Sequence, residues 1–186
     1  MVSLAALWLP ILLSAVIVFV ASSIIHMVLP IHKGDYRKVS DEERVMDALR
    51  SAGVTPGRTY HFPFCTHKDM KSAEVVEKFK RGPVGLLTIF PSGAPNMAKF
   101  LGQWFVYCLV VGIFTAYLTS RTRHAGTEYL QVFRVAGTTA FLGYSLAQIQ
   151  NAIWRGETWG VTLKHVLDGL IYGLITASIF ASLWPR

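Results

Sequence analysis

Four long apolar stretches place the strongest constraint on what this chain can fold into. They cover residues 7–29, 100–120, 132–154 and 162–184 of the 186-residue sequence. A helix needs about 20 apolar residues to cross the hydrocarbon core of a bilayer, and each stretch meets that length. A hydrophobic content of 52% and a mean hydropathy of +0.41 also indicate the membrane class. We therefore expect an all-α membrane protein built as a bundle of four transmembrane helices.

Charged residues concentrate between the first two apolar stretches. Residues 31–99 hold 12 of the 18 Lys and Arg residues and eight of the 11 Asp and Glu residues. Basic and acidic residues interleaved in this way are typical of a solvated surface, so we expect no nucleic-acid partner. The chain is thus divided into a first transmembrane helix (1–30), an insert (31–99) and three further transmembrane helices (100–186).

The distribution of basic residues predicts the orientation in the membrane. No Lys or Arg precedes the first apolar stretch, whereas Lys33, Arg37 and Lys38 follow it directly. The positive-inside rule then places the insert in the cytoplasm and both termini outside. The first stretch lacks the basic start of a signal peptide and is longer than a typical signal-peptide core, so we expect it to be retained as a helix.

Local signals in the insert predict a small α/β structure. A capping box formed by Ser40 and Glu43 predicts the start of one helix, and Ser72 predicts the start of a second. Residues 59–62 are typical of a short strand. Residues 84–90 fit either a second strand that pairs with residues 59–62 or a segment lying on the membrane surface. Their β-branched and aromatic content favours the strand.

The predicted topology brings polar residues from separate helices to the cytoplasmic edge of the membrane. These candidate ligand-binding residues are His26, Gln103, Gln148, Asn151, His165 and Asp168. The ordinary interpretation is hydrogen bonding between helices, with Asp168 neutralised by Lys164 one turn away. The alternative is a pocket for a quinone, a lipid headgroup or haem, in which His26 and His165 are ligands or proton carriers.

A second set of candidates lies in the insert, where His61, Cys65 and His67 fall within seven residues. Imidazole and thiolate donors suit zinc or copper. However, Pro63 interrupts the segment and no fourth donor follows at a characteristic spacing, so a packing role is the ordinary interpretation. The chain has no P-loop, GxGxxG, HExxH or GxSxG motif, and no reaction or cofactor is implied.

Five segments together resemble a known family: Ser22-Ser-Ile-Ile-His26-Met, Asp35-Tyr-Arg-Lys, Arg81-Gly-Pro-Val, Trp104-Phe-Val-Tyr-Cys-Leu-Val-Val-Gly and Asp168-Gly-Leu-Ile-Tyr. The chain is similar to an uncharacterised family of bacterial four-span inner-membrane proteins. The resemblance implies a bacterial inner-membrane location. It implies no activity and supplies no catalytic residues.

Small residues at close-packing intervals suggest helix–helix interfaces, as at Gly169, Gly173 and Ala177. Together with the missing catalytic motif, they favour an accessory or scaffolding subunit of a larger membrane complex, such as an electron-transfer complex, rather than an enzyme. The expected partners are the lipid bilayer and other membrane-protein subunits or a second copy of the chain. The alternative function is a small-molecule binding protein or enzyme with its site at the cytoplasmic membrane edge.

Overall fold

A computed structural model describes residues 2–186 and divides the chain into two compact units. The helical unit joins the segment that ends at Asp35 to residues 96–186, and the insert unit comprises residues 36–95. Residues 31–35 therefore belong to the helical unit, although the charge pattern assigned them to the insert. This difference matters below because two site residues lie in that short segment.

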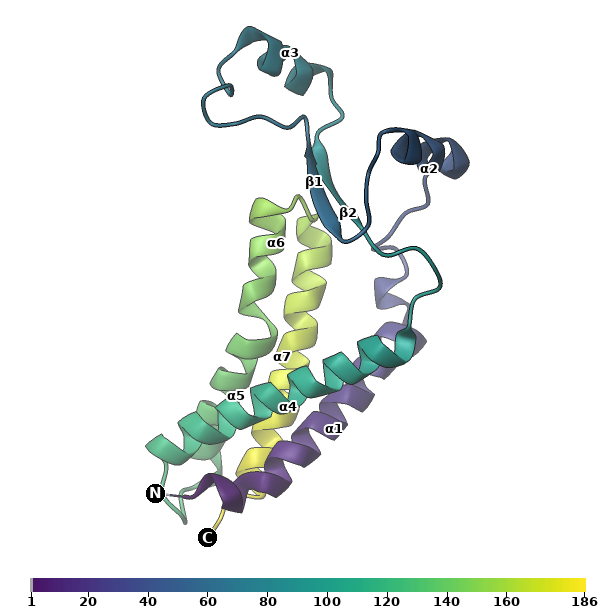
Figure 1. The fold of residues 1–186 in the computed structure, drawn as a ribbon. Helices are drawn as coiled ribbons and strands as arrows, with labels where there is room; N and C mark the ends of the chain where they lie inside the picture. Colours follow the sequence, from purple (N-terminus) through teal and green to yellow (C-terminus); the bar gives the residue numbers. More distant parts are fainter. Residues whose placement is uncertain (1) are drawn as a thin grey trace. The chain divides into compact units, whose positions relative to one another are not determined.

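The helical unit contains three segments that are long and apolar enough to cross a membrane. They are Leu4–Val28, Met97–Thr122 and Trp159–Ser182. The first comprises the helix α1 (Trp8–Ser23) with short helical turns η1 (Leu4–Leu7) and η2 (Ile24–Val28) at its ends. The other two are the helices α4 and α7 (Figure 1).

The third apolar stretch does not form one continuous helix, in contrast to the expected four continuous spans. It is divided into α5 (Tyr129–Tyr144), a turn η4 (Leu146–Gln148) and α6 (Ile149–Trp154). With 16 residues, α5 is shorter than the roughly 20 that a full crossing needs. The break is packed against α7: Ser145 Oγ donates to Val166 O at 3.1 Å, and a Cβ added to Gly169 would clash with Ser145 Oγ.

Small residues let α5 and α7 pack closely within the chain. A Cβ added to Gly137 would lie 3.0 Å from the Ala177 Cβ, and one added to Gly173 would lie 3.2 Å from the Phe141 amide nitrogen. Ala177 is fully buried, so this small-residue face lies inside the unit. Contacts of α1 with α4 and α7, and of α4 with α5, complete the packing of the helical unit.

The insert unit contains two short helices and a two-stranded sheet. Its elements are α2 (Glu42–Ser51), β1 (Arg58–Phe62), α3 (Ala73–Arg81) and β2 (Gly85–Ile89). The strands pair antiparallel, with Tyr60 opposite Leu87. The strand prediction for residues 84–90 is therefore confirmed over the surface-lying alternative.

Side-chain caps start both helices of the insert unit. Ser72 accepts a hydrogen bond from the Val75 amide, as predicted. The predicted cap of α2 is wrong by one residue, because Asp41 rather than Ser40 accepts from the Arg44 amide. Aspartate is as good an N-cap as serine, so two adjacent candidates compete and local spacing does not separate them.

Candidate metal centre

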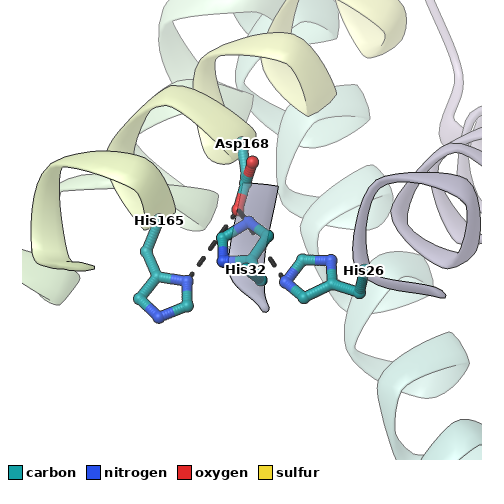
Figure 2. Close-up of side chains that lie close together, drawn as sticks. All are labelled: His26, His32, His165 and Asp168. Atoms are coloured by element: carbon teal, nitrogen blue, oxygen red, sulfur yellow. Dashed lines mark ion pairs between the residues drawn. The ribbon is translucent and has the colours of Figure 1, made fainter. Parts of the chain in front are cut away.

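Three histidines and one aspartate converge within the helical unit. They are His26, His32, His165 and Asp168, and one possible ligand atom from each lies within 4.8 Å of all the others (Figure 2). His26 lies on η2, His32 ends the turn η3 (Pro30–His32), and the other two lie one turn apart on α7. Elements far apart in the sequence therefore build the cluster.

A proline turn places His32 next to His26. The amide of Leu29 donates to Ile24 O at 3.0 Å and closes the wide π-helical turn η2. Pro30 has no N–H and keeps the residue before it extended, so the helix ends there. The chain then reverses, and the His26 and His32 rings stack with centroids 4.4 Å apart. Single π-helical turns are frequent at functional sites.

The Asp168 carboxylate occupies the centre of the cluster and is only 5% exposed (Figure 2). Its Oδ2 lies 3.0 Å from His32 Nε2 and 3.8 Å from both His26 Nε2 and His165 Nδ1. The 3.0 Å pair is misaligned for a hydrogen bond, and within residues 2–186 neither atom has a hydrogen-bond partner. Leaving a buried polar atom unpaired costs free energy, so an ion or small group bound to both atoms would stabilise the cluster.

Hydrogen bonds hold two of these histidines through Nδ1, which we call the outer nitrogen because Nε2 is the ring nitrogen paired with Asp168. His32 Nδ1 lies 2.6 Å from Asp35 Oδ2, and His26 Nδ1 lies 3.0 Å from the Ser22 carbonyl oxygen. A carboxylate or carbonyl oxygen only accepts, so each Nδ1 carries the hydrogen. In the neutral rings, both Nε2 atoms then carry a free lone pair that is available to a metal ion.

Lys164 supports this arrangement from α7. Its Nζ donates to Asp35 Oδ1 at 2.5 Å and to Ile31 O at 2.8 Å. The hydrogen bonds from Lys164 and His32 hold the pKa of the Asp35 carboxyl below its usual value, so this group is ionised at neutral pH. The expected pairing of Lys164 with Asp168 is replaced by this one, because the turn after Pro30 brings Asp35 within its reach.

A cavity of about 500 Å³ adjoins the cluster. His26, His165 and Asp168 line one part of it, and residues from α1, α4 and the end of α5 form its other walls. The cluster therefore has one side that faces an internal space large enough for a small molecule.

The six residues predicted for this site are only partly brought together. His26, Gln148, His165 and Asp168 line the cavity. Asn151 lies beside it and donates to Gln148 Oε1 at 3.1 Å. Gln103 is exposed on α4 and is not among the described residues of the cavity wall.

Sequence reasoning missed His32 and Asp35, because both follow the last apolar residue of the first stretch and were assigned to the insert. The signal that could have found them is Pro30. A proline directly after a membrane-length helix indicates a turn at the membrane edge, and a turn can bring the next few residues back against the helix ends.

The insert candidates do not meet in the same way. Among the described residues, the cluster on the helical unit is the one group of three or more His, Cys, Asp or Glu donors with metal-like spacing. The His61 ring hydrogen-bonds instead to the Pro63 carbonyl oxygen at 3.0 Å, and Cys65 is a free thiol. Metal binding by His61, Cys65 and His67 stays a prediction.

No protein-family model, curated protein or solved structure matches this chain. The resemblance to an uncharacterised bacterial membrane family therefore also stays a prediction, and the function is argued from the geometry of the cluster alone.

Proposed function

We propose that this protein is a metal-binding membrane protein whose site is formed by His26, His32, His165 and Asp168. One observation carries the proposal. Three imidazole nitrogens surround a buried carboxylate, and the outer nitrogens of His26 and His32 are already held by hydrogen-bond acceptors. Histidines that ligate metals are held in this way, because the outer hydrogen bond fixes the tautomer and aims the free lone pair.

The donor atoms all lie within 4.8 Å of one another, so small side-chain movements bring them to the spacing of one metal ion. Zinc lies about 2.1 Å from nitrogen and oxygen ligands, which puts tetrahedral ligand atoms about 3.4 Å apart. The three distances from Asp168 Oδ2 to the histidine nitrogens are 3.0, 3.8 and 3.8 Å and bracket that value. The ring planes are within 14° of parallel, so ligation includes a rotation of the rings that points each lone pair at one ion.

The donor types narrow the choice of metal. Three imidazoles and one carboxylate, with no thiolate, suit Zn²⁺, Fe²⁺ and neighbouring divalent first-row ions more than soft Cu⁺. Haem is disfavoured by the geometry. A macrocycle held between His26 and His165 needs an open gap, whereas Asp168 Oδ2 lies 3.8 Å from a ring nitrogen of each, and the His32 ring centroid lies 4.4 and 5.4 Å from theirs (Figure 2).

Asp35 and Lys164 form an outer layer around the metal ligands. A histidine that donates one nitrogen to a carboxylate and ligates through the other is a frequent arrangement in zinc sites. Here His32 is the histidine and Asp35 is the carboxylate. Lys164 in turn holds Asp35, with 2.5 Å between Lys164 Nζ and Asp35 Oδ1. The three residues link the turn after α1 to α7.

The proposal includes a location for the site. Three membrane-length helices support a membrane protein, and we infer a fourth crossing made by α5, η4 and α6 together. Interrupted helices are tolerated in a membrane where the break is buried in protein, as at Ser145. By the positive-inside rule, Lys33, Arg37 and Lys38 support a metal site at the cytoplasmic edge of the membrane, with both termini outside. A bacterial inner membrane is the location that the sequence resemblance implies. The accessory-subunit function stays a prediction from the sequence.

Metal content tests the proposal directly. Protein purified in mild detergent without chelator, or reloaded with Zn²⁺ or Fe²⁺, should contain about one metal ion per chain by plasma mass spectrometry. His165→Ala should lose that ion because it removes one of four ligands. His124→Ala is the matched control, since His124 is an exposed histidine of the same unit. Equal metal content in both variants, or no tight binding of any divalent ion by the wild type, contradicts the proposal.

A further inference from the structure

We propose that the cavity beside the metal site binds the head of a quinone, a flat, uncharged ring with two carbonyl oxygens. The quinone would make two polar contacts, one with the metal ion and one with a tyrosine hydroxyl. The first of these rests on the proposed function, which the inference deepens. Four protein ligands fill a tetrahedral site, so an oxygen atom of the small molecule would be a fifth ligand, bound from the side of the site that faces the cavity. His26, His165 and Asp168 present the metal site to such a space.

A hydroxyl donor one helical turn away supplies the second contact. Tyr172 lines the cavity and is only 4% exposed, and among the described residues its hydroxyl has no hydrogen-bond partner. It follows Asp168 by four residues on α7, so the two side chains project from the same face of the helix. In the proposed complex, one carbonyl oxygen of the ring contacts the metal ion and the opposite carbonyl oxygen accepts from the Tyr172 hydroxyl.

Aromatic side chains from α4, α5 and α7 line the cavity. The rings of Trp104, Tyr144 and Tyr172 contact one another, with centroids 5.6 to 6.2 Å apart. Tyr107 extends the group at 5.6 Å from Trp104 and donates from its hydroxyl to Gly143 O. Aromatic walls favour flat rings, which stack or meet them edge to face.

The lining of the cavity favours an uncharged ligand. No Lys or Arg is among the described residues of the lining, and its one acidic group, Asp168, belongs to the proposed metal site. A phosphate headgroup could therefore pair only with the metal ion, and its remaining charge would be desolvated without a protein cation beside it. A quinone ring carries no such charge and needs only the metal ion and the Tyr172 hydroxyl as polar contacts.

The rim of the cavity is apolar and exposed. Met27 and Met97 are 77% and 60% exposed, and they lie at the ends of two membrane-length segments. Flexible methionine side chains adapt to varied apolar ligands. This rim suits a molecule whose tail remains in the bilayer while its head enters the cavity.

Quenching of tryptophan fluorescence by a decyl-tailed benzoquinone tests the proposal in nanodiscs of metal-loaded protein. Trp104 lines the cavity, so bound quinone should quench it saturably, and Trp104→Phe should remove the saturable part. Tyr172→Phe should weaken binding about three- to tenfold through the loss of one hydrogen bond. Tyr129→Phe, at a half-exposed tyrosine on α5, should leave binding unchanged. Decanol of the same tail length should compete poorly.

The outcomes separate this inference from the proposed function. Protein that keeps its metal but shows only linear, non-saturable quenching overturns the quinone site and leaves the metal site standing. Saturable quenching that Tyr172→Phe does not weaken, or that decanol reverses equally well, also overturns it. If the protein holds no metal but its quenching by quinone saturates and Tyr172→Phe weakens it, the metal site is overturned and the quinone site is supported.

Discussion

Two groups of possible metal donors differ in how the chain brings them together. His61, Cys65 and His67 lie within seven residues of one another, yet they form no group with metal-like spacing. His26, His32, His165 and Asp168 come from three separate segments, yet their donor atoms gather within 4.8 Å. Closeness along the chain is therefore a poor guide to convergence of side chains in space.

The difference has a physical cause in the support around each group. His26 and His32 each have one ring nitrogen held by a hydrogen bond, and Lys164 holds the carboxylate behind His32. The insert candidates lie on and after a short strand, where successive side chains point to opposite faces, and Pro63 bends the segment between them. Packed helices and outer hydrogen bonds hold the donors of the helical unit close together, so that a rotation of the rings is enough to point them at one ion.

The largest expected effect follows from removal of the central carboxylate. Asp168→Asn should lower metal affinity by more than about 100-fold, because it takes away the one charged ligand that all three histidines face. Competition with a chromophoric chelator would measure it. Retention of wild-type affinity would show that the histidines alone form the site, or that no site exists there.

An intermediate effect is expected for the outer layer. Asp35→Asn should lower metal affinity about 10- to 100-fold, because the amide holds the His32 ring less firmly than an ionised carboxylate. A shift in the visible spectrum of Co²⁺-loaded protein, with little change in the melting temperature, would identify a positioning role. Asp47→Asn, at an exposed aspartate of α2, is the control and should change neither measurement.

The smallest effect is expected in the insert. The triple variant His61→Ala, Cys65→Ser and His67→Ala should keep one tightly bound metal ion with unchanged affinity, since these side chains take no part in the proposed site. Isothermal titration with Zn²⁺ would check the number of sites. Loss of a tight site in this variant would reverse the comparison and make the insert the metal-binding region.

Local features of the fold could be predicted from the sequence. The structure contains the predicted cap at Ser72, the two predicted strands, as Arg58–Phe62 and Gly85–Ile89, and three of the four predicted membrane-length segments. These features depend on neighbours in the chain. The break at Ser145 was not predictable from hydropathy, because it depends on how closely the Gly169 backbone approaches from α7. The cap at Asp41 shows the limit of local rules where two good capping residues are adjacent.

The sequence by itself determined that this chain has membrane-length apolar segments with a charged insert after the first, and that His26 lies near the end of one such segment while His165 and Asp168 lie near the start of another. Their common depth in a membrane stays a prediction from helix lengths and basic residues. Only the tertiary structure decided that His32 and Asp35 join them and that Lys164 pairs with Asp35. The physical reason is that the position of a residue along a helix can be estimated from hydropathy. Which side chains face one another depends on how the packed helices are rotated and on the turn after Pro30.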